Sequence, residues 1–329
     1  MILGTILFFI TVLLTTAFAT KWLEKDLRNR NVMDVPNHRS SHDAAVPHGG
    51  GLVVTHVVVF SWAGIGVFLG SDWTFFGMLF LVVFLAIISR LDDLFNVSIL
   101  IRLLFQVFSV VAGLLLMQKE GLFFQGIFPP AVDYFFAAIA WLWFINLFNF
   151  MDGIDGISGC EMASLGFGVA LMAALGVGGP LLGLAGVSLA AAGLGFLLLN
   201  WHPARIFLGD VGSIPIGYLV GWLLLGLSSA GFWLPALILP AYYFADSGIT
   251  LARRLFAGKP IWIAHREHFY QKAVSNGRSH SQVVSAIAVA NIGLIAAAVG
   301  SMYIGFYSLI FACLIVGVLL KWMSFNVSC

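Results

Sequence analysis

Long apolar stretches separated by short polar segments make up most of this chain. A helix needs about 20 mostly apolar residues to cross a bilayer, so each such stretch predicts a membrane-spanning helix. We expect an all-α, polytopic membrane protein with about 11 transmembrane helices and with catalytic loops on one face. The predicted spans are residues 2–20, 50–70, 74–91, 99–117, 132–149, 158–177, 181–199, 212–229, 232–250, 283–301 and 304–321.

The polar segments between these spans are short. The longest of them covers residues 251–282 and is too small to fold by itself, so we expect it to pack on the ends of the helices. The sequence shows no internal repeat. We therefore predict one membrane-embedded domain over residues 1–329.

Composition supports membrane residence. Hydrophobic residues make up 60% of the chain and charged residues only 9%, against about 25% charged residues in an average soluble domain. A soluble globular protein is excluded because it could not cover its surface with polar groups. We expect the lipid bilayer as a partner and no nucleic acid, while a homodimer is left open.

The charges predict an orientation. A basic cluster at Lys21, Lys25, Arg28 and Arg30 follows the first apolar stretch, which is typical of an uncleaved first span with its N-terminus outside. With the spans alternating from there, Lys119 is the only one of the 16 Lys and Arg residues in an outside segment. Most acidic residues also lie near the inside face, which the positive-inside rule does not require. These acidic residues are therefore the candidates for catalysis or metal binding.

The second inside loop reads LDDLFNVS and places Asp92 and Asp93 where a span meets the cytoplasm. Adjacent carboxylates near lipid are costly unless they are paired or bind a metal. A single acid would be enough to end a span. The pair therefore favours a hard cation such as Mg²⁺, which prefers oxygen ligands.

The third inside loop, NLFNFMDGIDGISG, carries a regular set of polar side chains. Asn146, Asn149, Asp152 and Asp155 recur every three residues, so on a helical continuation they would line one side. Packing at the end of an apolar span does not call for such a line. We interpret it as part of a binding or catalytic site.

The first and fourth inside loops supply further candidates. Residues 33–52 contain Arg39 and His42 before a run of glycines, a composition suited to phosphate contacts but also found in ordinary loops. In the fourth loop, Asp210 stands between glycines at the start of a span, and Arg205 precedes it. Asp210 could be a helix N-cap, but the surrounding turn favours a carboxylate directed into a pocket.

The fifth inside loop contains the sequence HREHFYQ, with His265, Arg266 and His268. Two histidines three residues apart can bind zinc, but the HExxH pattern and a cysteine set are missing. We favour phosphate contact or proton transfer for these residues. We interpret His56 and His280 as structural.

Together, these five loops resemble the polyprenyl-phosphate N-acetylhexosamine-1-phosphate transferase family. The first loop fits Asp-x-Pro-Asn-x-Arg-x-x-His and a later Pro-x-x-Gly-Gly, and residues 92–93 fit an Asp-Asp motif. Residues 146–156 fit Asn-x-x-Asn-x-x-Asp-Gly-x-Asp-Gly, and residues 207–213 fit Phe-x-Gly-Asp-x-Gly-Ser. The match runs in order through nearly the whole chain. Two departures are Asn96, where a third acid is common, and the Arg266–Glu267 pair inside the histidine motif.

The resemblance implies transfer of an N-acetylhexosamine 1-phosphate from a UDP-sugar to undecaprenyl phosphate, with release of UMP, in a bacterial inner membrane. It implies Mg²⁺ as cofactor, with Mn²⁺ as a substitute, and an active site that faces the cytoplasm. The implied metal ligands are Asp210 and Asp93. The implied catalytic residues are Asp92, Asp93, Asp155, His265 and His268. The implied substrate-binding residues are Arg39, His42, Asn146, Asn149, Asp152, Arg205 and Arg266.

The histidine segment is most similar to that of the branch that starts O-antigen, a part of lipopolysaccharide. A peptidoglycan-precursor transferase is the alternative within the family, and the donor sugar is left open. Direct transfer and transfer through a covalent intermediate are both left open. A membrane transporter is the alternative from another class. Transporters, however, place their coupling residues near the middle of the membrane, whereas these acids lie at span ends.

Overall fold

Helices make up almost all of the structure. The computed structural model describes residues 2–34, 45–95, 97–117, 121–260 and 265–326. Within these ranges the only strands are β1 (Met33–Asp34) and β2 (Val46–Pro47), which pair antiparallel. The helices are α1 (Ile2–Asn29), α2 (Gly51–Leu69), α3 (Trp73–Phe95), α4 (Ile99–Leu116), α5 (Pro130–Phe150), α6 (Ile157–Ala174), α7 (Gly179–Asn200), α8 (Asp210–Ser229), α9 (Trp233–Ile238), α10 (Ala241–Phe256), α11 (Phe269–Ser275), α12 (His280–Ile304) and α13 (Tyr307–Ser324). The predicted all-α polytopic fold is confirmed.

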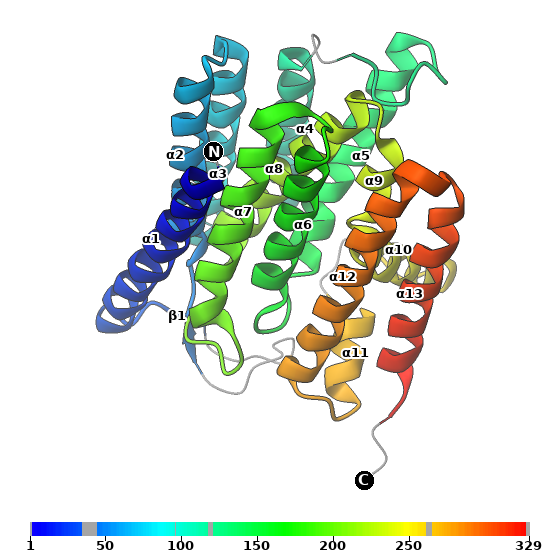
Figure 1. The fold of residues 1–329 in the computed structure, drawn as a ribbon. Helices are drawn as coiled ribbons and strands as arrows, with labels where there is room; N and C mark the ends of the chain where they lie inside the picture. Colours follow the sequence, from blue (N-terminus) through cyan, green and yellow to red (C-terminus); the bar gives the residue numbers. More distant parts are fainter. Residues whose placement is uncertain (1, 35–44, 96, 118–120, 261–264, 327–329) are drawn as a thin grey trace.

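The long helices run side by side from one end of the molecule to the other, with α8 in the centre (Figure 1). The whole 18-residue apolar window of α8 is buried inside the protein, whereas only 11% of the corresponding window of α1 is buried. Helices α2, α3 and α5 are among those that pack against α8. Since α8 begins at Asp210, this packing fixes the position of that carboxylate at the lower end of the bundle.

Ten helices in the described part of the chain are long and apolar enough to cross a membrane. They correspond to ten of the predicted spans. The prediction of a continuous helix over residues 232–250 is wrong, because the chain there forms the short α9 and then α10. Pro240 separates the two helices, since proline lacks the N–H that a continuous helix would need at that position.

In Figure 1, α9 and α10 lead the chain from the upper end part of the way down, and α11 lies at the lower end. At the upper end, Ser228 of α8 donates from Oγ to the carbonyl of Phe123, 2.5 Å away. At the lower end, α12 begins with His280, close to Asp155 in the loop that follows α5. The chain must therefore descend between residues 230 and 279. The predicted eleventh span is therefore divided between two helices, α9 and α10.

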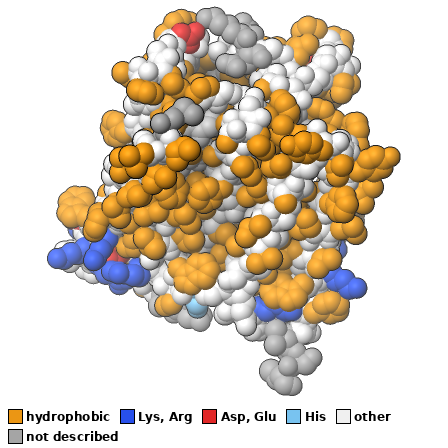
Figure 2. All heavy atoms as spheres, in the orientation of Figure 1, with side chains coloured by type: hydrophobic (Ala, Val, Ile, Leu, Met, Phe, Trp, Pro, Cys, Tyr) orange, Lys and Arg blue, Asp and Glu red, His pale blue; other side chains and the backbone are white. Residues whose placement is uncertain are grey.

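The outer surface is that of a membrane protein. Large apolar side chains such as Phe60, Phe80 and Leu198 are each more than two-thirds exposed. Figure 2 shows apolar side chains over most of the visible face and Lys and Arg gathered along its lower edge. An exposed apolar surface of this extent fits lipid rather than water.

Two loops that are far apart in the sequence meet beneath α8. The backbone N–H groups of Gly50 and Gly51 donate to the carbonyls of Phe207 and Leu208, each at 2.8 Å. A Cβ atom added to Gly51 would lie 2.3 Å from the backbone of Gly212. Only a residue without a side chain allows this approach. The first inside loop is thus fixed against the segment that carries Asp210.

Candidate active site

Three of the predicted loops converge at the lower end of α8. Asp92, in the last turn of α3, accepts a hydrogen bond from Arg102 Nη1 at 2.5 Å. The same nitrogen lies 3.3 Å from Asp210 Oδ2, at the start of α8. Arg102 belongs to the first turn of α4, so one guanidinium joins the ends of three helices. The structure thus brings together Asp92 and Asp210, as predicted.

Asn149 connects the third loop to this group. Its Nδ2 donates to Asp210 Oδ1 and to Ser213 Oγ, both at 2.8 Å. Asp210 is the first residue of α8, and the N-cap is Gly209, whose φ of 73° lies in the left-handed region that favours glycine. The carboxylate of Asp210 is therefore directed toward Asn149 and Arg102, and Asp210 is not the N-cap of α8.

Two residues of this site were missed by the sequence reasoning. Arg102 was counted only as an inside charge. His48 lies directly over Gly209, because a Cβ there would come within 2.4 Å of His48 Nε2. His48 is close enough to interact electrostatically with Asp93 and Asp152. Its place immediately before the glycines of the first loop was a signal that could have found it.

Asp93 follows Asp92 in the last turn of α3 and faces the same region. Its Oδ2 lies 3.6 Å from Arg90 Nη1, and it is also near the charge of Asp210. Two arginines, Arg90 and Arg102, thus stand beside the Asp-Asp pair. Without such cations, adjacent carboxylates at this depth would repel each other strongly.

Asp152 lies in the loop between α5 and α6. Its Oδ1 accepts a hydrogen bond from Ser158 Oγ at 2.5 Å. Burial raises the pKa of Asp152 to about 6, and the charge of Asp210 acts in the same direction. A carboxyl group with such a pKa changes its charge just below neutral pH, a property common in functional sites.

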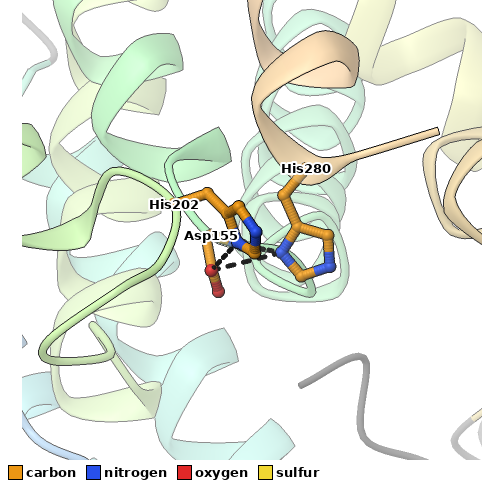
Figure 3. Close-up of side chains that lie close together, drawn as sticks. All are labelled: Asp155, His202 and His280. Atoms are coloured by element: carbon orange, nitrogen blue, oxygen red, sulfur yellow. Dashed lines mark hydrogen bonds and ion pairs between the residues drawn. The ribbon is translucent and has the colours of Figure 1, made fainter. Parts of the chain in front are cut away.

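Asp155 lies next to two histidines that the sequence did not connect with it (Figure 3). His202 Nδ1 donates to Asp155 Oδ2 at 2.6 Å, and the N–H of Ala204 donates to the same oxygen at 3.1 Å. His280 Nδ1, at the start of α12, lies 3.3 Å from that oxygen. The carboxylate therefore joins the loop after α5, the loop after α7 and the first turn of α12.

This cluster of Asp155, His202 and His280 has the donor set of a transition-metal site, with ligand atoms within 4.8 Å of one another. However, Asp155 already accepts two hydrogen bonds and is only 5% exposed. Burial raises the pKa of Asp155, but the neighbouring His280 and His202 rings outweigh burial and hold that pKa below the ordinary value. We therefore interpret the cluster as a tie between loops, and His280 has a more specific role than the sequence indicated.

The remaining predicted substrate residues are spread more widely. Asn146 donates to Gln106 Oε1 at 2.8 Å, one helical turn above Asn149. Arg205 donates to Glu24 Oε2 in α1 at 2.9 Å, so its described ion pair is not with Asp210. Arg266 is exposed on the fifth loop. Arg39 and His42 lie outside the described residues, as does Asn96.

The two histidines of the fifth loop differ in environment. His268 is 3% exposed and its Nδ1 lies 3.1 Å from the carboxylate of Asp246 in α10. His265 is partly exposed. Its burial, and to a smaller extent the charge of the neighbouring His268, lowers the pKa of His265 to about 4. Asp246 is a further residue that the sequence reasoning missed. An acid inside a predicted apolar span is costly without a partner, so its position was a signal for a functional role.

The arrangement can hold a hard divalent cation. Asp92, Asp93 and Asp210 offer only carboxylate oxygens, which Mg²⁺ prefers, and each of them already lies beside an arginine: Asp92 and Asp210 beside Arg102, and Asp93 beside Arg90. The amide of Asn149 uses its nitrogen as donor to Asp210, which holds that carboxylate in place. The donor set therefore fits Mg²⁺, with Asp93 and Asp210 as the ligands expected from the sequence.

Comparison with known proteins gives a consistent result. Residues 75–228, which include Asp92, Asp155 and Asp210, match glycosyl transferase family 4. The chain is 28% identical to a probable undecaprenyl-phosphate N-acetylglucosaminyl 1-phosphate transferase of Bacillus subtilis, over 85% of this chain and 80% of the relative. It is 27% identical to the undecaprenyl-phosphate alpha-N-acetylglucosaminyl 1-phosphate transferase of Escherichia coli K12, over 87% and 82% of the two chains. The similarly named protein of Yersinia pestis is 26% identical, over 79% and 74%.

Proposed function

Because residues 75–228 of this chain match glycosyl transferase family 4, we propose that the protein transfers an N-acetylhexosamine 1-phosphate from a UDP-sugar to undecaprenyl phosphate. The resemblance deduced from the loop motifs is confirmed at the level of the family. UDP-N-acetylglucosamine is the first donor to test, because the relatives are named for that sugar. The lipid-linked product would start a surface glycan, for which we keep O-antigen as the proposal.

The proposed reaction exchanges one phosphoanhydride for another. An oxygen of the lipid phosphate attacks the β-phosphorus of the UDP-sugar, and the bond from that phosphorus to the oxygen of the α-phosphate breaks. UMP leaves with that oxygen, and the products are the lipid diphosphate sugar and UMP. Such a reaction depends mainly on positioning and on neutralising phosphate charge.

The single observation that carries the proposal is the group of Asp92, Arg102, Asn149 and Asp210. Residues from four separate helix ends meet there at hydrogen-bond distances, which packing alone does not require. Bound Mg²⁺ would neutralise the diphosphate and the departing UMP, and we propose that Asp93 and Asp210 hold it. Arg102 keeps Asp92 in a fixed direction, and we propose that Asp92 orients the lipid phosphate.

The group with Asp152 would serve the nucleotide side. Asp152 follows Asn149 in the loop after α5 and is held by Ser158. Asp155, with its two histidines, keeps this loop attached to the segment that leads into α8. The proposal for Asp155 is therefore positioning of the loop, and direct contact with the reacting phosphates is assigned to Asp92, Asp93 and Asp210.

This protein is a multi-pass membrane protein, and we propose that its active site faces the cytoplasm of a bacterial inner membrane. Lys and Arg side chains gather at the same lower edge (Figure 2) to which α8 brings Asp210. Cytoplasmic segments carry an excess of basic residues, which supports this orientation. A UDP-sugar is a soluble cytoplasmic molecule, whereas the lipid acceptor lies in the bilayer beside the helices.

The test uses the purified full-length protein in detergent with undecaprenyl phosphate, Mg²⁺ and a panel of UDP-sugars, and it measures released UMP. We expect UMP and a labelled lipid product with UDP-N-acetylglucosamine or a close relative, and loss of both after chelation of divalent ions. Asp210→Asn is the control variant, in which we expect UMP release to be strongly slowed. If no UDP-sugar gives UMP while the protein is folded, the proposal is wrong and a transport function has to be tested.

A further inference from the structure

Helix α10 has one buried polar face. Tyr242, Asp246, Thr250 and Arg254 are spaced four residues apart, so they lie along one side of the helix. All four are at most 5% exposed, whereas Leu255 and Phe256 on other sides of the helix are 63% and 89% exposed. An acid and an arginine buried on a short helix in a membrane protein need partners. Pro260 and residues 267–270 provide those partners.

Asp246 holds the start of α11. Its Oδ1 accepts from the N–H of Phe269 at 3.0 Å, and its Oδ2 accepts from the N–H of Tyr270 at 3.1 Å. His268 Nδ1 lies 3.1 Å from Oδ1. A carboxylate only accepts hydrogen bonds, so the hydrogen in this contact belongs to His268 Nδ1. Asp246 thus fixes the ring of His268 and the backbone of the two residues that follow it.

His268 in turn supports His265. The two rings are stacked with their centroids 5.0 Å apart and with an angle of 23° between their planes. His265 Nδ1 accepts from the N–H of Glu267 at 3.3 Å, so the hydrogen of the neutral ring is on Nε2. The lowered pKa of His265, about 4, means that the ring is neutral at pH 7. The nitrogen that His265 offers to a ligand is therefore an N–H donor.

The charged groups around this pair belong to the same unit. Glu267 accepts from Arg254 Nη1 at 2.5 Å and from Lys259 Nζ at 3.0 Å. Arg254 Nη2 also donates to the carbonyl of Pro260 at 2.8 Å. These contacts attach both ends of the histidine loop to α10, with Asp246 at one end and Arg254 at the other.

The unit is docked on the loop that carries Asp152. Tyr270 Oη donates to the carbonyl of Phe150 at 2.9 Å. The same hydroxyl would lie 2.1 Å from a Cβ added at Gly153, so α11 is in contact with that loop. The unit is therefore held on that loop by a contact that does not involve the Asp246 side chain.

We propose that Asp246 is a positioning residue, which fixes His268 so that the stacked His265 donates its Nε2–H to a phosphate or sugar oxygen of the bound nucleotide sugar. This inference rests on the proposed function. His265 is then the histidine that touches substrate, and Asp246 and His268 act through it. Carboxylates that orient a functional histidine in this way commonly matter for activity about as much as the histidine itself.

The test replaces Asp246 by Asn, which keeps the size of the side chain but removes its charge and one acceptor oxygen. We expect kcat for transfer from the active UDP-sugar to fall about 10- to 100-fold. KM for the donor should change by less than about threefold, because a hydrogen bond that strengthens as charge builds up on the substrate oxygen lowers kcat rather than raising KM. His265→Ala should lose a similar share of kcat.

A double substitution separates positioning from general damage. If Asp246 acts through His265, the Asp246→Asn/His265→Ala protein should have the kcat of His265→Ala within about twofold. Losses that multiply would overturn the inference. Asp133→Asn is the matched control, because buried Asp133 also accepts from two consecutive N–H groups, those of Phe123 and Phe124, at the other end of the bundle. It should lose thermal stability but keep the wild-type kcat.

A second measurement does not depend on activity. Protein labelled with ¹⁵N-histidine should show an Nδ1–H signal that disappears in His268→Gln and is lost or strongly shifted in Asp246→Asn. If that signal is unchanged in Asp246→Asn, the inference fails even when transfer is observed. If the wild-type protein releases no UMP but the signal behaves as expected, the contact is correct and the proposed function is wrong.

Discussion

Replacing Asp210 by Asn tests the centre of the proposed site. The substitution keeps the shape of the side chain and one oxygen that can accept a hydrogen bond from Asn149 Nδ2. In the wild type this nitrogen lies 2.8 Å from Asp210 Oδ1. It removes one negative charge that lies 3.3 Å from Arg102. Unit charges about 4 Å apart gain about 4 kcal/mol at an effective dielectric constant of about 20, and a divalent ion gains about twice as much. Water and the remaining carboxylates would replace most of the attraction that the divalent ion loses.

If only a quarter of that attraction is lost, the barrier rises by about 2 kcal/mol, which is about a 30-fold slower reaction. The assay measures UMP release over a titration of Mg²⁺, with Asp72→Asn at the opposite end of α3 as control. We expect a lower rate and a higher Mg²⁺ requirement for Asp210→Asn, with unchanged thermal unfolding. A variant that keeps more than about a tenth of the wild-type rate at each Mg²⁺ concentration loses less than about 1.4 kcal/mol, and Asp210 would then not be a metal ligand.

Three further predictions concern the surroundings of this centre. The pKa of Asp152 is about 6, so if its ionised form binds the nucleotide, kcat/KM should fall about tenfold per pH unit below pH 6. The Asp152→Asn variant should not show this fall in kcat/KM, and a flat profile for the wild type would contradict the role of Asp152. The pKa of Asp155 is held below its ordinary value, so its contribution to stability is present above the unfolded pKa of about 3.9 and is lost as pH falls through the folded value. His202→Ala should therefore lower the melting temperature at pH 7, and the difference from wild type should shrink in acid; a difference independent of pH would refute the role of the carboxylate. Gly212→Ala would place a Cβ 2.6 Å from Gly51 Cα and should cost about 1–3 kcal/mol of stability, whereas Gly64→Ala in α2 has no neighbour within 4 Å and should be harmless.

The fold could be predicted from hydrophobic pattern almost completely. Ten continuous spans appear where the apolar stretches are, because a run of that length has few other uses. The failure at residues 232–250 has a local cause. Pro240 and the polar residues after it lie within a mostly apolar stretch, but Asp246 and Arg254 are spaced for one helical face. That periodicity is the sequence signal that distinguishes α10 from the rest of the stretch.

The site could be predicted only in part, because sequence spacing does not give helix rotation or tertiary neighbours. Asn149 reaches Asp210, but Asn146, one turn away on the same helix, faces Gln106 instead. Arg205 pairs with Glu24 in α1, a contact between residues 181 positions apart. Arg102 is missed for the same reason, since its pairing with Asp92 depends on how the α3–α4 hairpin closes.

The polarity of the helices explains why a cation belongs at this point. Asp210 is at the N-terminal end of α8, where the helix dipole is positive and stabilises a carboxylate. Asp92 and Asp93 are in the last turn of α3, where the dipole is negative and disfavours them. The Asp-Asp pair therefore gains more from a nearby positive charge than Asp210 does, and Arg102 and Arg90 supply part of it. The diphosphate of a nucleotide sugar would add further negative charge to this group, and two arginines cannot balance three carboxylates and a diphosphate. A divalent ion between the end of α3 and the start of α8 would supply most of the missing positive charge, which is why we expect the reaction to depend on it.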